Sequence, residues 1–355
     1  MKWYGWTRRM AIIGLAAAML LLAGCGWFGA SETVGQIDPP QIDYDFESGL
    51  DVGLSDDGDI SAVMANVGPE APVTLYFKDP AGHVAPLGVR IPAEEGIAKL
   101  MLSHMVEGGP LAEQLPEGFT ALLPQGTKVL AMDIREGLAT VDFSTEFTSY
   151  DAQDERKILE AVTWALTGFD TIDQVRIWVD GKPLAQMPRD ATPLDEPLSR
   201  AMGINLEIDE DVNPARASAV TVYFAGETLD DYTYYVPVTR LIRYTEDRAT
   251  AAVRELLEGP SAGSGLSAVL PSDTEVLHVQ LRDDTVIVNF GGMMNEQENT
   301  LQASAVEAVV LSMLEQTGFP KVQIMVDGSA GVRVGSAKEF ASPVTRPASI
   351  NPIQS

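Results

Sequence analysis

The sequence contains two copies of one unit, and this duplication restricts the possible folds more than any other feature. The paired segments, each 147 positions apart, are Val73–Phe77 with Val220–Phe224, Leu123-Pro124 with Leu270-Pro271, Val141–Phe143 with Val288–Phe290, and Val179–Gly181 with Val326–Gly328. Self-similarity at a fixed spacing indicates one supersecondary unit built twice. We therefore predict two domains with the same fold, over residues 73–205 and 220–351, joined by a linker at 206–219.

Both copies predict the same first elements. Each opens with a β-branched and aromatic strand, at 73–77 and 220–224, and Val84–Ile91 is a candidate for a further strand. Apolar residues at helical spacing follow, namely Ile97, Leu100, Met101 and Met105 in the first copy and Ala249, Ala252, Val253, Leu256 and Leu257 in the second. Thr245-Glu246-Asp247 is a typical helix start, and Gly-Pro ends each helix.

The second half of each unit predicts a hairpin, a helix and a closing strand. The hairpin strands are expected at 128–134 and 138–143, and again at 275–281 and 285–290. The helix has apolar Ile158, Val162, Ala165 and Leu166 in the first copy, matched by Leu301, Ala305, Ala308 and Val309 in the second. An alternating strand at 175–179 or 322–326 closes each unit before an Asp-Gly turn.

These elements predict an α+β fold of two tandem repeats. Each repeat is a small β-α-β-β-α-β sandwich with its helices on one face of the sheet. Trp164 and Trp178 fall on apolar faces, so we expect them in the core.

The N-terminus predicts export and lipid attachment. Met1–Gly24 reads as a signal peptide, with a basic start and an uncharged stretch that is too short to span a bilayer. It ends in Leu22-Ala23-Gly24-Cys25, which looks like the lipobox of bacterial lipoproteins. We expect cleavage before Cys25 and a diacylglyceryl group on its thiol, with fatty acyl chains such as palmitate. Two acyl chains suffice for stable membrane anchoring.

Residues 25–72 are expected to form a disordered tether behind the lipidated cysteine. Acidic residues recur between positions 26 and 72, where Lys, Arg and His are missing and Gly and Pro are frequent. Such a composition repels itself and does not bury a core.

Charge and residue usage exclude several kinds of function. The formal net charge of −27 at pH 7 argues against nucleic-acid binding, which needs Lys and Arg to neutralise phosphates. Cys25 is the single cysteine, and the three histidines lack metal-ligand spacing. We therefore expect no metal and no cofactor.

No catalytic constellation is recognisable either, so we predict a protein that is not an enzyme. Ser264 lies in a Gly/Ser-rich loop without the Gly-x-Ser-x-Gly frame of hydrolases. His104 has no histidine counterpart in the second copy and is expected on the surface of a helix. Asp142 is the best single carboxylate candidate, but the second copy has Asn289 there, which favours a structural role in capping or turning the backbone.

The order of these motifs resembles the GerMN-domain family of sporulation and germination lipoproteins. The features that match are the opening Val-Thr-x-Tyr-Phe strand, Leu-Leu-Glu-Gly-Pro at 256–260, Leu-Pro followed by Thr, Val141-Asp142-Phe143-Ser144, and Val-Asp-Gly. The resemblance implies folds akin to ring-building modules, with possible ring or oligomer assembly. It also implies a lipoprotein on the mother-cell membrane, facing the forespore, that supports the channel complex between the two cells through protein partners.

The sequence leaves three functions to distinguish. The leading hypothesis is a non-enzymatic assembly lipoprotein whose modules contact partner proteins. A solute-binding lipoprotein of a transporter would also carry a lipobox and two lobes, but such lobes usually hold larger parallel sheets than these short repeats allow. A wall-modifying germination enzyme would need an acid, base, nucleophile or metal set that the sequence does not offer. If partners dock by strand addition, the opening strands Val73–Phe77 and Val220–Phe224 are the expected edges.

Overall fold

The computed structural model describes residues 70–208, 212–291, 300–330, 332–334, 338–340 and 342–353. The expected signal peptide, the lipobox residues Leu22, Ala23, Gly24 and Cys25, and most of the acidic segment lie outside these residues.

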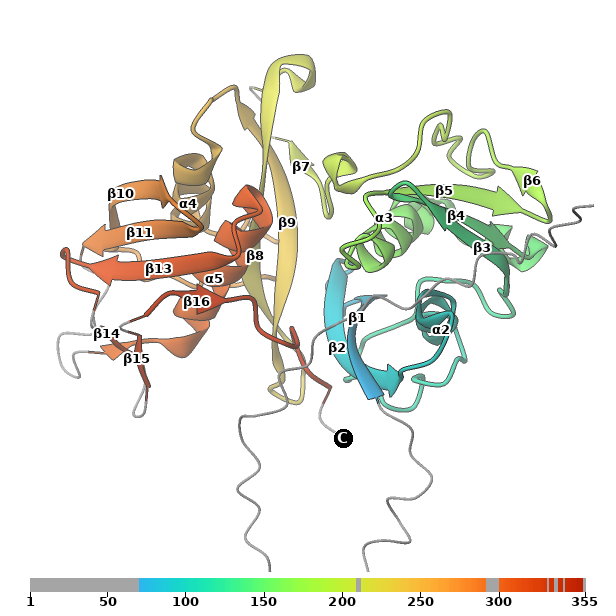
Figure 1. The fold of residues 1–355 in the computed structure, drawn as a ribbon, viewed down its shortest axis with the longest axis horizontal. Coiled ribbons are helices and arrows are strands. Elements are labelled where there is room, and N and C mark those ends of the chain that lie inside the picture. Colours follow the sequence, from blue (N-terminus) through green and yellow to red (C-terminus); the bar gives the residue numbers. More distant parts are fainter. Residues whose placement is uncertain are drawn as a thin grey trace, which may run out of the picture. The chain divides into compact units, whose positions relative to one another are not determined.

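The first repeat contains two helices, two hairpins and several short turns of 3-10 helix. Its elements are β1 (Glu70–Lys78), β2 (Val84–Pro92), α2 (Ile97–His104), β3 (Val129–Arg135), β4 (Leu138–Phe143), η3 (Thr145–Thr148), η4 (Ala152–Asp154), α3 (Glu155–Leu166), β5 (Gln174–Val179), β6 (Lys182–Pro183) and η5 (Arg200–Met202). This order follows the chain colours of Figure 1 from blue to yellow-green.

The second repeat has the same order, with extra short strands late in the chain. Its elements are β7 (Glu207–Ile208), η6 (Pro214–Arg216), β8 (Ala217–Glu227), β9 (Thr233–Arg243), α4 (Arg248–Glu258), β10 (Glu275–Arg282), β11 (Thr285–Gly291), β12 (Thr300–Leu301), α5 (Ala303–Thr317), β13 (Lys321–Val326), β14 (Val332–Val334), β15 (Lys338–Phe340) and β16 (Val344–Thr345). The α+β class and the two tandem repeats are therefore confirmed.

Each repeat is layered as hairpin, helices and sheet. In the first repeat β1 and β2 form an antiparallel pair, while a second sheet has the order β3-β4-β5-β6. Helix α3 contacts both β1 and β5, so the helical layer lies between the hairpin and the sheet (Figure 1). The opening strand thus stays out of the main sheet and pairs with Val84–Pro92, which the sequence offered only as an additional strand.

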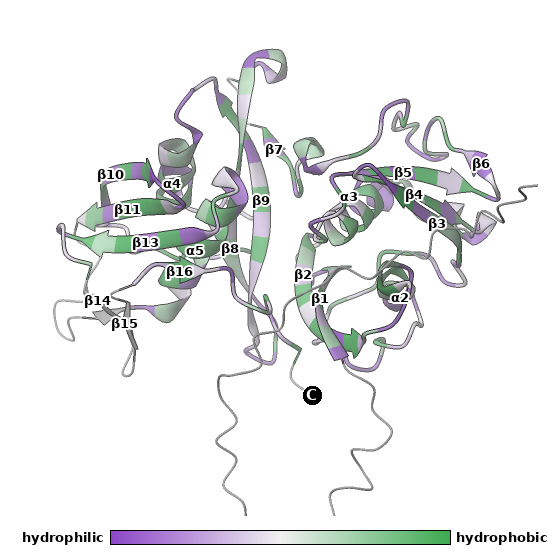
Figure 2. Ribbon diagram, in the orientation of Figure 1, coloured by the Kyte–Doolittle hydropathy of each residue, from purple (hydrophilic) through white to green (hydrophobic). Residues whose placement is uncertain are grey.

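The first three strands of the main sheet have the same topology and register in both repeats, whereas β6 pairs with the end of β5 and β16 with the start of β13. Strand β4 pairs in parallel with β5, and β11 pairs in parallel with β13. A right-handed crossover of about this length normally needs a helix, and α3 and α5 supply it. The crossover helices bury their apolar sides against the hairpin as well as the sheet, which explains why so much of each helix is green in Figure 2.

The core explains the opening motif. Leu75 and Phe77 are fully buried, and so are Val222 and Phe224 at the corresponding positions. Tyr76 and Tyr223, which point to the other side of each strand, are also buried. A strand that is covered on both faces reads as a continuous apolar run, as these two do.

Most helix signals are confirmed, with two errors. Helix α2 ends at His104, so Met105 and the expected Gly109-Pro110 stop lie beyond it. The side chain of Asp247 caps α4 by accepting a hydrogen bond from the Thr250 N–H at 3.0 Å, as the Thr-Glu-Asp start predicts. Leu301, however, lies in β12 and not in the second helix, which begins at Ala303. Trp164 is buried, whereas Trp178 is only half-buried.

Two asparagines join the repeats in a reciprocal way. Asn205 Oδ1 accepts from Val84 N at 2.7 Å, and its Nδ2 donates to the carbonyls of Val84 and Pro237, both at 2.8 Å. Asn351 does the same in the opposite sense. Its Oδ1 accepts from Tyr235 N at 2.8 Å, and its Nδ2 donates to the carbonyls of Tyr235 at 2.8 Å and Pro86 at 2.7 Å.

The two asparagines occupy equivalent positions. Pro86 pairs with Tyr76 in the first hairpin, and Pro237 pairs with Tyr223 in the second. Each asparagine therefore binds its own hairpin and then the same proline carbonyl of the other hairpin. Both asparagines have positive φ, 48° and 49°, a conformation that asparagine adopts more readily than most residues. The repeats are thus related by an approximate twofold arrangement.

Candidate functional site

The Asp142/Asn289 position holds a turn. Asp142 accepts the Gly181 N–H at 2.9 Å, and Asn289 Oδ1 accepts the Gly328 N–H at 3.0 Å. Each glycine belongs to the Asp-Gly turn after the closing strand. Because the bond needs only an acceptor oxygen, aspartate and asparagine serve equally. The expected structural role is what the geometry supports.

The other residues considered for chemistry are also engaged in local structure. His104 ends α2 and places Nδ1 2.8 Å from the carbonyl oxygen of Leu100, so this nitrogen carries the proton. Ser144 Oγ accepts the Lys128 N–H at 3.0 Å, and Ser264 Oγ accepts the Leu266 N–H at 3.3 Å. In the described residues, no group of three His, Cys, Asp or Glu side chains is placed to hold a metal ion.

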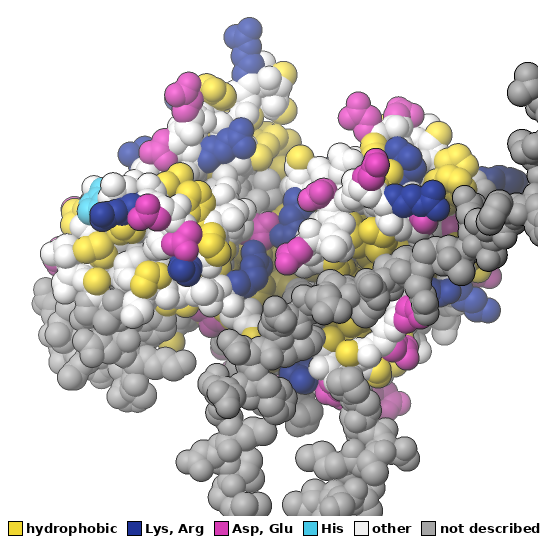
Figure 3. All heavy atoms as spheres, viewed as in Figure 1, with side chains coloured by type: hydrophobic (Ala, Val, Ile, Leu, Met, Phe, Trp, Pro, Cys, Tyr) yellow, Lys and Arg dark blue, Asp and Glu magenta, His cyan; other side chains and the backbone are white. Residues whose placement is uncertain are grey.

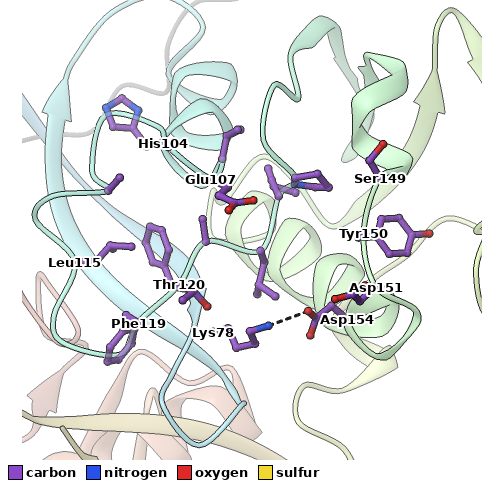
Figure 4. Close-up of a pocket in the computed structure, with 18 of the residues that line it drawn as sticks. Lys78, His104, Glu107, Leu115, Phe119, Thr120, Ser149, Tyr150, Asp151 and Asp154 are labelled. Atoms are coloured by element: carbon purple, nitrogen blue, oxygen red, sulfur yellow. Dashed lines mark hydrogen bonds and ion pairs between the residues drawn. The ribbon is translucent and has the colours of Figure 1, made fainter. Parts of the chain in front are cut away.

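A cavity of about 660 Å³ lies in the first repeat. One wall is the connector between α2 and β3, including Glu107, Leu115 and Phe119. The other is the segment from Ser149 to Asp154 (Figure 4). None of these positions was predicted as a binding site from the sequence. The sequence signal that could have indicated the cavity is the longer connector: 24 residues separate α2 from β3, whereas 16 separate α4 from β10.

Hydrogen bonds fix both walls of the cavity. Lys78 at the end of β1 exchanges two backbone hydrogen bonds with Thr120, at 2.8 and 2.9 Å. The Glu107 N–H donates to the Leu123 carbonyl at 2.9 Å. The connector is therefore attached to β1 and folded back on itself, so the cavity is preformed.

The second wall is organised by Glu155, which begins α3 and is almost fully buried. Its carboxylate accepts hydrogen bonds from Tyr150 Oη at 2.8 Å and from the N–H groups of Arg189, Asp190 and Thr192 at 2.9 to 3.0 Å. Burial by itself would raise the pKa of Glu155, but the hydrogen bonds outweigh burial and lower the pKa to about 2. Burial and the same contact raise the pKa of Tyr150.

The floor of the cavity carries an ion pair. Lys78 Nζ lies 2.8 Å from Asp154 Oδ2, and Lys157 Nζ lies 3.4 Å from Asp154 Oδ1. Figure 4 shows Lys78 and Asp154 facing one another, with Asp151 beside them. Within the described part of the chain, the carboxylates of Glu107 and Asp151 make no hydrogen bond or ion pair. The cavity thus has a mixed lining of polar and apolar side chains, with one neutralised carboxylate and two that are free.

Of the two edges expected for strand addition, the one on β8 is covered by a helix. The Thr221 and Tyr223 N–H groups on the outer edge of β8 donate to Gln316 and Ser312 of α5, at 3.0 and 2.9 Å. Helix α5 therefore occupies that edge, and β8 is not available for docking. Within the described residues, the main sheets end in β3 and β6 in the first repeat and in β10 and β16 in the second. Strands β3 and β10 are the long edges, since β6 and β16 have two residues each.

Strands β3 and β10 share an irregularity. Both have a β-bulge, after Val129 and after Val276. The bulge presents Leu130 and Leu277 to solvent, 46% and 49% exposed. On the face drawn in Figure 3, hydrophobic side chains likewise show between interspersed acidic and basic ones. A bulge bends an edge away from flat pairing while leaving its side chains accessible.

The fold defines a class first: a tandem-repeat α+β protein whose two domains are joined by equivalent contacts. A protein-family model named Germane, described as "Sporulation and spore germination", matches residues 74–185 and 221–331. The chain belongs to this family, which takes part in sporulation and spore germination.

Two relatives extend the match over both domains. The chain is 35% identical to the "Spore germination protein GerM" of Bacillus subtilis (strain 168), over 96% of this chain and 97% of that protein. The solved "Tandem GerMN domains of the sporulation protein GerM from Bacillus subtilis" has a TM-score of 0.75 and 35% identity, covering 81% of this chain and all of that one. No helix in the described residues is long and apolar enough to cross a membrane.

Proposed function

We propose that this protein is a non-enzymatic lipoprotein that supports assembly of the channel complex between mother cell and forespore. The observation that carries this is the similarity to GerM over nearly the whole of both chains. The local structural roles of Asp142, Ser144 and His104 support a function without catalysis.

The proposed site of action is the extracytoplasmic face of the mother-cell membrane, with lipid on Cys25 as the anchor. The experiment is a Cys25→Ser variant in sporulating cells, compared with the native chain by membrane fractionation, fatty-acid labelling and sporulation efficiency. We expect the variant to lose the label, to leave the membrane fraction and to lower sporulation. Full retention of label and membrane association would contradict the anchor.

The proposed partners are proteins of that complex, together with further copies of this chain in a ring. An exported, strongly acidic chain suits partners with basic surfaces. Recovery of the same proteins with the native chain, and their loss with the edge variants described below, is the supporting result. A chain that recovers no partner from sporulating cells, yet restores sporulation fully, would contradict the assembly role.

A further inference from the structure

The cavity of the first repeat has no role in the proposed assembly function. It is not a consequence of the shared fold, because its connector wall is longer than the equivalent segment of the second repeat. Its volume of about 660 Å³ falls within the range of small-ligand sites. The hydrogen bonds of Glu155 and Thr120 fix its shape before any ligand arrives.

The charges in the cavity indicate what such a ligand must carry. Lys78 already shows the favoured contact, since its ammonium lies on Asp154 at 2.8 Å. The opposite wall carries Glu107, which Figure 4 shows directed into the space between the walls. A cation that entered would meet Glu107 and Asp151, neither of which has a partner among the described residues.

The apolar side chains of the cavity indicate what the uncharged part of the ligand is. Leu115, Phe119 and Leu122 belong to the connector wall, and Phe119 packs edge-on against Tyr234 with ring centroids 4.8 Å apart. These groups suit an aliphatic stem better than a hydrated inorganic cation, which would gain little from them.

We propose that this cavity binds a short peptide through a lysine-type side chain. In this proposal the primary ammonium group enters between the two walls that carry Glu107 and Asp151, and the methylene stem packs against Leu115 and Phe119. Arg189, which also lines the cavity, is placed to donate a hydrogen bond to a carbonyl or carboxylate oxygen of the same peptide. The volume suits roughly three residues, so the ligand is a small peptide and not a folded surface.

The test is isothermal titration calorimetry on the full chain with the peptide acetyl-Ala-Lys-Ala-amide. Two matched probes replace lysine by Nε-acetyl-lysine or by norleucine, which keep the stem and remove the charge. We expect binding of the lysine peptide and at least a tenfold loss with either probe. Equal binding of the three peptides, or no binding of the lysine peptide to the folded protein, would overturn the proposal.

Protein variants provide the second arm. Glu107→Gln combined with Asp151→Asn should weaken the lysine peptide at least tenfold, whereas Glu113→Gln, on the same connector but outside the cavity, should leave binding unchanged. Circular dichroism verifies that all variants fold. Unchanged affinity in the double variant would contradict the assignment of the carboxylates. If only a longer lysine peptide bound, the occupant would be an extended segment of a partner protein and the short-peptide proposal would fail.

Discussion

Asp142 and Asn289 show how one position can change its chemistry and keep its role. Each is held in the strand beside an Asp-Gly turn and accepts the glycine N–H of that turn. The turn residues Asp180 and Gly181 both have positive φ, 51° and 72°, as a tight primed turn requires. The acceptor oxygen holds this turn closed, so the side chain at this position has a structural role.

The first prediction follows from that hydrogen bond. Asp142→Asn should change the free energy of unfolding by less than about 0.5 kcal/mol, because the amide oxygen replaces the carboxylate oxygen. Asp142→Ala removes the acceptor and should destabilise the protein by about 1 kcal/mol. Urea unfolding measures both. If Asp142→Asn abolished sporulation while the chain and its partners stayed intact, the carboxylate would have a chemical role and the enzyme hypothesis would replace ours.

The second prediction concerns acid stability. The folded-state pKa of Glu155 is lowered to about 2, below its ordinary value of 4.5. Its ionised form therefore stabilises the fold fully above about pH 4.5, and this contribution of about 3 kcal/mol is lost as the pH falls towards 2. Glu155→Gln should be less stable at pH 7 and should lose less stability on acidification.

Measurement of unfolding by urea at several pH values between 7 and 2.5 tests this. The control is Glu94→Gln, an exposed residue whose removal should leave the pH profile of the native chain unchanged. A Glu155→Gln variant with the same pH dependence as the native chain would show that Glu155 does not carry this acid sensitivity.

At the scale of elements, helix α5 covers a strand edge that α3 leaves without equivalent side-chain bonds. Thr-Gly-Phe marks the end of both helices, at 167–169 and 317–319, so Ser312 and Gln316 correspond to Val162 and Leu166. The expected match of Val162 and Leu166 with Ala305 and Val309 was therefore wrong by seven residues. Only the second repeat can therefore bind its opening strand through helix side chains. This is a difference between copies that the apolar pattern of the helices does not reveal.

The third prediction tests that cover. Ser312→Ala leaves the buried N–H of Tyr223 without its 2.9 Å acceptor and should cost about 1–3 kcal/mol. Ser304→Ala, on the same helix but half-buried, should change stability by less than about 0.5 kcal/mol. Thermal unfolding compares the two. Equal melting temperatures would show that the edge of β8 is satisfied in another way.

The fourth prediction concerns the open edges β3 and β10. Leu130→Lys together with Leu277→Lys should reduce recovery of partner proteins from sporulating cells, because a charge at each bulge opposes strand addition and apolar contact. Both side chains are about half exposed, so the fold should be retained. Leu229→Lys, at an 89% exposed leucine outside these edges, is the control and should leave recovery unchanged. If the Leu229→Lys variant lost its partners and the edge variant kept them, β3 and β10 would be excluded as docking sites.

Most elements could be predicted because each was present twice. The hairpin strand predicted at 138–143 and the closing strand predicted at 175–179 agree with β4 and β5 within one residue, because β-branched runs and turn residues mark their ends. The pairing of the opening strand could not be predicted, because an apolar run buried on both faces does not specify its neighbour. Leu301 was misplaced because an apolar residue just before a helix fits its periodicity.

At the scale of the whole molecule, the repeats are coupled. Besides the two asparagines, Arg200 binds Glu315 at 2.7 Å and Tyr234 Oη donates to Asp79 at 3.1 Å. Desolvation would raise the pKa of Glu315, but the guanidinium groups of Arg200 and Arg346 lower it overall. The sequence predicts units that fold independently, while these contacts favour joint unfolding.

The fifth prediction distinguishes joint unfolding of the repeats from independent unfolding. Asn205→Ala should destabilise the whole chain by roughly 3 kcal/mol, because three hydrogen bonds are lost. Hydrogen exchange should show weaker protection of amides in both repeats, β9 included. The control is Ala201→Ser, at an exposed residue of the same segment, which should leave stability and protection unchanged. Loss of protection confined to residues 73–205 would establish independent units.

The contacts between repeats and the cavity were beyond the sequence for a common reason. Asn205 and Asn351 are visible as a matched pair in the repeat, but nothing local shows that each reaches a carbonyl of the other copy. The cavity depends on a longer connector without a motif, and its walls come together only after β1 and the connector have paired. Long-range pairing decides both features.

The reciprocal asparagines have a consequence for how such a chain can evolve. Two identical subunits that met through this contact would be altered together by every mutation, since one gene would encode both halves. Joining the halves in one polypeptide makes their association independent of protein concentration and releases each half from copying the other. Here the first half has the longer connector and the second has the side-chain cover of β8. The asparagine bonds involve neither the connector nor Ser312 and Gln316, so each copy could change there without breaking them.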